Sequence, residues 1–186
     1  MRVKGTAYLA RVQLLKAKLG SDEAVEEFLA RYQRSHPEFP KSVIPTTQIP
    51  AHTFLAFVDA VVDEVYGGER DSLWDIGRRS AEWALTAGPY KSLLEFKDVE
   101  RFAAMASVMW SNYFDKGSAR SEIYDDRIEL WIEDVPEDVR HPYFEFSVVG
   151  YFQRGLELLG AEVRREAVES FVSGGERVHY RLITAR

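Results

Sequence analysis

The sequence contains no cysteine among its 186 residues. Disulfide bonds, thiolate metal ligands and cysteine nucleophiles are therefore excluded. A cysteine-free chain is typical of reducing compartments, and no apolar run approaches the roughly 20 residues that cross a bilayer. The first residues, Met1 to Thr6, carry no apolar signal core. We therefore expect a cytoplasmic protein that does not contact membranes.

Positive charge is neither abundant nor concentrated. The chain has 24 Lys and Arg against 30 Asp and Glu, a formal net charge of −6. Basic residues mostly stand beside acidic ones, as in Arg154-Gly155-Leu156-Glu157, and the densest basic pair is Arg78-Arg79. Nucleic-acid-binding proteins usually gather basic residues on one face. We therefore expect no nucleic-acid partner.

Catalytic and metal-binding motifs are also missing. The sequence has no His-x-x-x-His or His-x-His spacing, no Gly-x-Ser-x-Gly elbow and no Walker lysine loop. Its acidic pairs, Asp125-Asp126 and Glu133-Asp134, fall at the ends of expected strands, where charges are normally solvated. We therefore expect no enzyme activity, no metal and no cofactor. The four histidines each have an ordinary structural explanation, in loops, at helix starts or on a strand: His36, His52, His141 and His179.

Apolar residues recur at helical spacing through most of the chain. Four prolines between residues 37 and 50 interrupt this pattern and predict a rigid connecting loop. We expect a single domain over residues 1–186, in which residues 1–50 form an N-terminal helical subregion that ends in the proline-rich loop. The spacing predicts helices over 6–19, 21–36, 51–65, 72–87, 90–96, 99–115 and 141–159.

The period changes near residue 119. Apolar and polar residues alternate from Arg127 to Glu133, which predicts a half-buried strand that pairs with residues 119–125. A second hairpin is predicted from strands at 163–172 and 176–184, with Ser173-Gly174-Gly175 as the turn. The order of elements predicts an α+β fold: N-terminal helices plus a four-stranded antiparallel sheet made of two hairpins separated by a helix.

Aromatic residues make up 13% of the chain, including four tryptophans. Trp74 and Trp83 are nine positions apart, so they lie on opposite faces of one helix and cannot both face the same core. Core packing accounts for most of these rings, and a lined ligand pocket is the alternative. The residues that we expect to line such a pocket are Trp74, Met105, Met109, Trp110, Tyr113 and Phe152.

Two stretches of the sequence carry a family resemblance. Met1-Arg2-Val3-Lys4-Gly5-Thr6 leads directly into a helix, which breaks at Gly20-Ser21-Asp22, and Leu73-Trp74-Asp75-Ile76-Gly77-Arg78-Arg79 places a tryptophan before a Gly-Arg step. Both stretches are similar to those of haem nitric-oxide/oxygen-binding (H-NOX) domains. The resemblance covers nearly the whole chain and implies an α+β sensor domain.

The last third of the chain resembles a related small-molecule-binding domain of the four-vinyl-reductase (4VR) type, which is shared with vesicle-tethering subunits. The overall pattern also looks like a family of paralogues expanded in myxobacteria. The residues that carry the 4VR resemblance are Gly150-Tyr151-Phe152-Gln153-Arg154-Gly155-Leu156, Leu159-Gly160, Glu169-Ser170, Gly174 and Val178-His179-Tyr180-Arg181-Leu182.

The sequence departs from both families at their functional residues. H-NOX domains hold haem iron through a histidine on the helix before the first hairpin; counted from Lys116-Gly117, that position falls at or near Val108, and the 99–115 helix contains no histidine. The Tyr-x-Ser-x-Arg motif that clamps the haem propionates is also missing. Ser170 and Val178 stand where 4VR-type domains often carry cysteines. Haem held by a proximal histidine, and gas sensing by that route, are therefore not expected.

Two functions remain open at this point. The first is a non-enzymatic sensor or regulatory module that binds an apolar or aromatic small molecule without haem. The second is a protein-interaction or dimerisation module whose pocket has closed. An apolar cavity of roughly 300 Å³ or more would favour the first. A filled core with a self-complementary apolar surface would favour the second, with a homodimer or another protein as partner.

Overall fold

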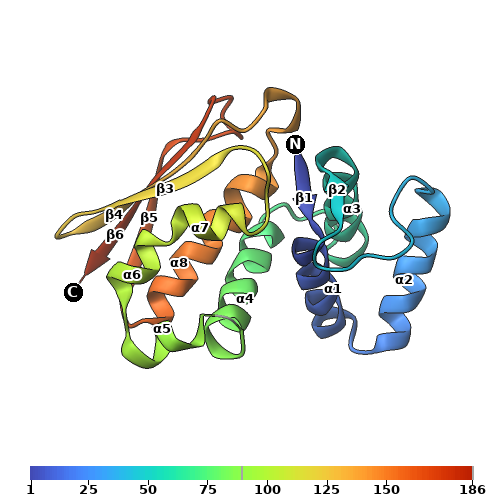
Figure 1. Cartoon of the computed structure of the whole chain (residues 1–186), viewed down its shortest axis with the longest axis horizontal. Helices are drawn as coiled ribbons and strands as arrows, with labels where there is room; N and C mark the ends of the chain where they lie inside the picture. The colour runs from blue at the N-terminus through green and yellow to red at the C-terminus, as the bar shows by residue number, and fades with distance from the viewer. Residues whose placement is uncertain (89, 186) are drawn as a thin grey trace.

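The computed structural model describes residues 1–88 and 90–185, with the helices of residues 5–65 on one side and the main sheet on the other (Figure 1). None of the helices in these residues is long and apolar enough to cross a membrane. The first half consists of β1 (Arg2–Lys4), α1 (Gly5–Leu19), α2 (Asp22–Ser35), β2 (Gln48–Pro50), α3 (Ala51–Val65) and α4 (Ser72–Thr86). The second half consists of α5 (Lys91–Phe96), α6 (Val99–Ala104), α7 (Ala106–Ser111), β3 (Ser118–Ile123), β4 (Arg127–Glu133), η1 (Glu137–Val139), η2 (Tyr143–Ser147), α8 (Val148–Leu158), β5 (Glu162–Glu169) and β6 (Val178–Ala185).

The main sheet has four antiparallel strands in the order β3-β4-β6-β5. The chain makes the β3–β4 hairpin, crosses through α8 and returns as the β5–β6 hairpin, so that β6 lies beside β4. Leu130 is paired with Tyr180, and Trp131 with His179. The predicted α+β class, with two hairpins separated by a helix, is therefore confirmed.

The turn of the second hairpin is longer than the sequence predicts. Strand β5 ends at Glu169 and β6 begins at Val178, whereas the prediction extended the strands to residues 172 and 176. The fully buried carboxylate of Glu145 on η2 explains this difference. It accepts hydrogen bonds from the hydroxyls of Ser170 (2.9 Å) and Tyr180 (2.7 Å) and draws the start of the loop away from the sheet.

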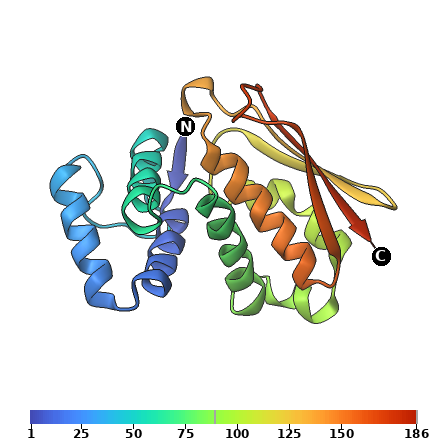
Figure 2. The ribbon, with the colours of Figure 1, turned by 180° about the vertical axis from the view of Figure 1, so that it is seen from behind.

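Helices α4 and α8 lie side by side on one face of the sheet (Figure 2). Glycine allows this close packing. A Cβ atom at Gly150 of α8 would lie 2.8 Å from the carbonyl oxygen of Trp74 on α4, and a Cβ atom at Gly77 of α4 would lie 2.0 Å from the carbonyl oxygen of Ser147, the residue before α8. No other residue fits at either position without movement of its neighbour.

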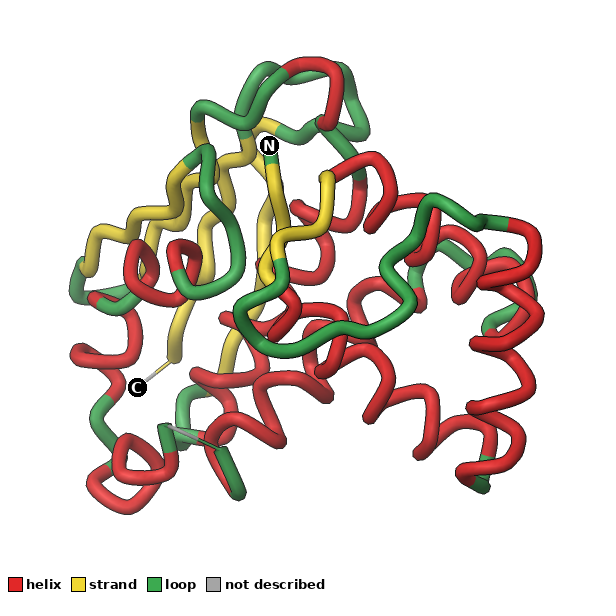
Figure 3. The backbone as a smooth tube through the Cα atoms, turned by 45° about the vertical axis from the view of Figure 1, so that its right-hand side comes forward, coloured by secondary structure: helices red, strands yellow, loops and turns green. Residues whose placement is uncertain are grey.

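A second, two-stranded sheet is missed by the sequence analysis. β1 pairs antiparallel with β2, and Val3 is opposite Ile49. Strands of three residues are too short to show an alternating pattern, which is why periodicity does not detect them. Figure 3 shows this small sheet beside the N-terminus, where the end of the proline-rich segment returns to the start of the chain.

The predicted 99–115 helix is wrong in two respects: it breaks at Met105 into α6 and α7, and α7 ends at Ser111. The hydroxyl of Ser121 on β3 donates a 2.6 Å hydrogen bond to the carbonyl oxygen of Ala103. The same oxygen also accepts a hydrogen bond from the backbone N–H of Met105 at the end of α6. The predicted 141–159 helix likewise begins with a π-helical turn, η2, before it becomes α8. Neither irregularity changes the apolar periodicity, so the sequence does not reveal it.

The buried apolar residues form one cluster that runs from Val3 to Leu182. In the N-terminal part its centre is aromatic: the ring centroids of Tyr32 and Phe57 are 5.2 Å apart, and those of Phe39 and Phe57 are 5.5 Å apart. In the C-terminal part, the inward-facing side chains of β4 and β6 pack against the helices. The candidate site lies between these two parts.

Candidate functional site

An internal cavity of about 50 Å³ lies where α1, α4, α7, η2 and α8 meet the first strand of the main sheet. Seven of its lining side chains are aromatic or methionine, and the polar ones come mainly from α1 and α4. Its walls are therefore apolar on the sheet side and polar at one end. The lining residues are Arg11, Ser80, Ala106, Met109, Trp110, Tyr113, Phe114, Ala119, Tyr143, Ser147, Val148, Tyr151 and Phe152.

The apolar wall is held in a fixed position by Trp110 on α7. Its indole nitrogen Nε1 donates a 3.0 Å hydrogen bond to the carbonyl oxygen of Lys116, and its ring packs 4.5 Å from the ring of Phe114. Gly117 sits against the indole ring with a φ of +74°, a conformation that favours glycine. This turn allows the backbone to pass close to the ring and keeps the ring against the cavity.

Arg11 forms the polar end of the cavity. Its side chain lies inside the protein, with 8% of the residue exposed, yet its Nε atom has no hydrogen-bond partner. Nη1 makes a long hydrogen bond of 3.4 Å to the carbonyl oxygen of Ile76, and the guanidinium lies 5.7 Å from the centroid of the Tyr143 ring. Ser80 donates to the same Ile76 oxygen at 2.8 Å, so Arg11 shares its one acceptor.

Two tyrosines complete the polar part of the lining. The hydroxyl of Tyr151 is buried without a hydrogen-bond partner, and burial raises the pKa of this phenol well above its ordinary value. Burial also raises the pKa of Tyr113, and the nearby positive charge of Arg11 opposes that rise. Both phenols are therefore neutral donors at physiological pH.

The structure brings four of the six sequence-predicted pocket residues together around the cavity: Met109, Trp110, Tyr113 and Phe152. Trp74 and Met105 are not part of this lining. The Trp74 ring stacks on Phe146 at 4.6 Å and lies under the guanidinium of Arg165 at 4.2 Å, because α4 turns that face toward the sheet edge. Met105 stands at the break between α6 and α7.

The sequence analysis missed Arg11, Tyr143 and Tyr151 as lining residues. A signal for Arg11 was present: it lies three residues after Tyr8 and four before Leu15, on the apolar side of the first helix. The buried residues of α1 are indeed Gly5, Ala7, Arg11 and Leu15. An arginine in that stripe is a candidate functional group because an unpaired charge is costly to bury.

The residues of this cavity do not fit a haem. No histidine of the described residues lines it, and Val108, the position counted for the proximal ligand, is 49% exposed and lies outside the lining. Haem-sized ligands occupy pockets of several hundred Å³ (roughly 300–1,000 Å³), about tenfold more than the space between these side chains. The closed aromatic packing, rather than the missing histidine alone, separates this site from a haem pocket.

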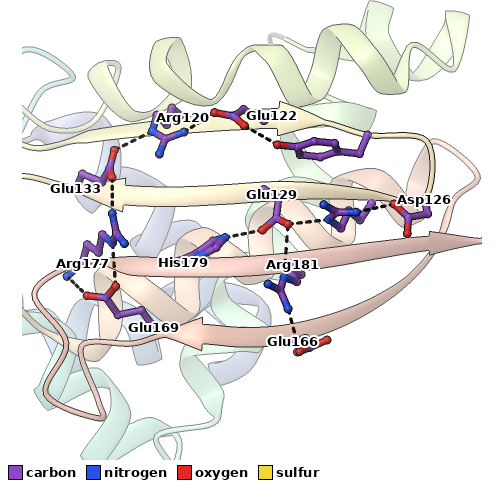
Figure 4. A network of polar contacts seen from close by, with 12 residues as sticks. Arg120, Glu122, Asp126, Glu129, Glu133, Glu166, Glu169, Arg177, His179 and Arg181 are labelled. Carbon is purple, nitrogen blue, oxygen red and sulfur yellow. Dashed lines mark hydrogen bonds and ion pairs between the residues drawn. The ribbon is translucent and has the colours of Figure 1, made fainter.

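The opposite, outer face of the sheet carries a network of ion pairs (Figure 4). Glu129 is contacted by Arg127 at 2.7 Å, by Arg181 at 3.5 Å and by His179, whose ring stacks on Trp131. Burial alone would raise the pKa of Glu129, but the hydrogen bonds from Arg127 and His179 lower it below its ordinary value of 4.5. The His179 side chain lies on the outer face, as predicted from its position in the strand.

The rest of this network is similarly matched. Arg120 contacts Glu122 and Glu133, and Arg177 contacts Glu133 and Glu169. Within residues 1–88 and 90–185, no group of three or more metal-ligating side chains gathers here or elsewhere. The charged side chains of the outer face are therefore paired with one another.

A surface groove of about 480 Å³ lies at the end of the sheet, where the α5–α6 turn meets the β3–β4 turn. Three large side chains around it are exposed: Phe96 (78%), Ile123 (39%) and Tyr124 (41%). This groove is about tenfold larger than the cavity beside Arg11, and its lining also contains the charged side chains of Lys97, Asp98 and Glu100.

Comparison with solved structures identifies the fold. An H-NOX protein from S. oneidensis, in an Fe(II) ligation state, superposes with a TM-score of 0.74 at 10% identity, over 98% of this chain and 96% of that chain. The chain has the H-NOX fold. An H-NOX protein of T. Tengcongensis matches with a TM-score of 0.70 at 14% identity over 98% of each chain, and the Cs H-NOX with 0.68 at 17% identity over 98% and 97%. No protein-family model and no curated protein sequence matches this chain.

Proposed function

We propose that this protein is a non-enzymatic sensor or regulatory module that has the H-NOX fold and binds a small molecule without haem. The observation that carries the proposal is the small cavity, which is lined largely by aromatic side chains and by two buried polar groups, Arg11 and Tyr151, that lack full hydrogen bonding. The sequence resembles H-NOX domains, and this resemblance implies a sensor.

The size of the cavity limits the ligand. About 50 Å³ is room for one or two water-sized groups, since one water takes about 30 Å³ in the liquid. This is below the roughly 300 Å³ that would favour a sensor pocket by volume, so the support for the proposal comes from the unpartnered polar groups of the cavity and not from its size. In the closed conformation the ligand is therefore a small one, and a larger apolar ligand requires the α7 side chains to move.

Xenon is a suitable neutral probe because it enters small apolar cavities. We expect a saturable change in the ¹²⁹Xe NMR shift with the wild-type protein. Ala106→Val adds two methyl groups to the cavity wall and should abolish that change, whereas Ala104→Val, on the exposed side of α6, should preserve it. Equal xenon responses in all three proteins would argue against a ligand cavity.

The addition of haemin tests the second part of the proposal, that the cavity does not hold haem. Haemin added to the purified protein should give no stoichiometric Soret band, because no described histidine faces the cavity and the aromatic wall leaves no space. A stoichiometric band that disappears in Met109→Leu or Tyr113→Phe would contradict this, since methionine and tyrosine can also ligate haem iron.

The second candidate function is a dimerisation module, and the groove beside Phe96 favours it. Contiguous exposed apolar side chains often mark interfaces. If a second copy of this chain binds there, the wild type is a dimer and Phe96→Glu is a monomer at the same concentration by light scattering. A wild-type monomer up to high micromolar concentrations would count against this alternative.

Two further resemblances of the sequence support the proposal. The likeness of residues 150–182 to 4VR-type domains and of the whole pattern to a myxobacterial family of paralogues supports small-molecule binding over catalysis. The cytoplasmic location that the cysteine-free sequence predicts stays a prediction.

A further inference from the structure

Arg11 is the one lining residue of the cavity that carries a formal charge. A guanidinium has five N–H donors, and in the described residues Arg11 uses only one of them, in the 3.4 Å bond to Ile76. Its Nε atom is buried and unpartnered, and no carboxylate of the described residues forms an ion pair with it. Packing therefore does not account for the charge.

The other buried charged side chains have short hydrogen bonds or ion pairs. Glu145 is fully buried on the neighbouring η2 turn, yet it accepts hydrogen bonds from Tyr180 and Ser170. Glu129, at 5% exposure, is contacted by three basic side chains. Arg11, at 8% exposure, has no such counterpart, although burial of an unpaired charge is costly.

The remaining polar groups of the cavity are donors as well. Tyr151 has a buried hydroxyl without a partner, and its raised pKa keeps the proton on the oxygen. A planar guanidinium binds the two oxygens of a carboxylate or similar oxyanion side by side. A cavity with a guanidinium and a phenol and with no carboxylate is therefore suited to an acceptor that brings negative charge.

We infer that the ligand of this cavity is a small oxyanion, of the size and chemistry of a short-chain carboxylate, bound by the guanidinium of Arg11 with the Tyr151 hydroxyl as a second donor. The inference rests on the proposed function and adds the ligand class to it. The cavity volume limits the anion to about two or three non-hydrogen atoms, the size of formate. The apolar wall of Met109, Trp110 and Phe152 covers the rest of the ligand.

The test uses formate and its neutral isostere formamide. In buffers of constant ionic strength, formate should raise the midpoint of thermal unfolding saturably, and formamide at the same concentrations should not. Arg11→Met should lower the formate affinity by about ten- to one hundred-fold, as expected for the loss of a charge-assisted hydrogen bond. Arg79→Met, which removes an exposed arginine paired with Asp75, should respond like the wild type.

Tyr151→Phe provides a second variant that removes one oxygen and preserves the ring. It should lower the formate affinity by several-fold, roughly the value of one neutral hydrogen bond, and it keeps the inference testable if Arg11→Met does not fold. Equal effects of formate and formamide, or an unchanged formate response in both variants, would overturn the inference.

Xenon separates this failure from that of the proposed function. If the wild type binds xenon in the cavity but does not distinguish formate from formamide, the cavity is a ligand site and only the anion class is wrong. If xenon does not bind either, the proposed function fails together with the inference. Retained xenon binding by Arg11→Met shows that the substitution removed the charge and not the cavity.

Discussion

The outer face of the main sheet and the cavity on its helical side differ in how they accommodate charge. On the outer face, Glu129 is held by Arg127, His179 and Arg181, and the neighbouring charges are matched in the same way. In the cavity, Arg11 is equally buried and has no charged partner. The first arrangement is explained by the stability of the sheet. The second is not, and this difference is the reason that we propose the cavity as the functional region.

The largest effect is expected at the apolar wall of the cavity. Trp110→Ala should lower the free energy of unfolding by about 3–5 kcal/mol, because a buried tryptophan loses its packing and its bond to Lys116. Urea unfolding followed by circular dichroism measures this. Trp83→Ala, at a ring that is 45% exposed, serves as the control and should cost less than about 1 kcal/mol. Similar losses in the two variants would mean that the cavity wall is not the tight packing described here.

The next effect concerns the outer face. Glu129→Gln should destabilise the protein by about 1–3 kcal/mol at neutral pH, since three basic side chains lose their buried acceptor charge. The folded-state pKa of Glu129 is lowered, so its contribution is complete above the ordinary value of 4.5 and is lost as the pH falls through the lowered value.

The wild type and Glu129→Gln should therefore approach the same stability in acid, diverge as the pH rises through the lowered pKa toward 4.5, and keep a constant difference above it. Unfolding free energies measured between acid and neutral pH test this. A difference that stays constant across that range would show that Glu129 stabilises the sheet by packing and not by its charge.

Arg11→Met should change the free energy of unfolding in the opposite direction. Without ligand, replacing an unpaired buried guanidinium by an apolar side chain of similar length should raise the free energy of unfolding by about 1 kcal/mol. Chemical unfolding in a buffer free of small carboxylates measures the change. A loss of stability as large as that of Glu129→Gln would indicate that Arg11 is a structural residue and would remove the contrast between the two regions.

The smallest effect is expected at the rim of the outer network. The ion pair of Glu166 with Arg181 is long (3.5 Å), and both side chains are more than 40% exposed. Glu166→Gln should change the unfolding free energy by less than about 0.5 kcal/mol, because exposed pairs contribute little. A larger loss would mean that the outer face acts as one cooperative network, which a double-mutant cycle with Glu129→Gln would reveal.

The sequence predicts the two hairpins, the helix between them and the outward position of His179, because alternation and helical spacing are local signals. It does not predict the break at Met105, beside which Ala103 accepts a hydrogen bond from Ser121, eighteen residues further along the chain. Four cavity residues were predicted from an aromatic-rich helix and from Phe152. Arg11 and Tyr151 were missed, because only the tertiary structure shows that their polar atoms are buried without partners.

A crystal of the protein held under xenon gas offers the most direct test of the central claim. Anomalous diffraction locates each bound xenon atom. The account predicts one well-occupied site enclosed by Met109, Trp110 and Phe152, with Arg11 at its polar end. No xenon in the interior, or xenon only in the surface groove beside Phe96, would contradict a ligand cavity and favour the dimerisation module instead.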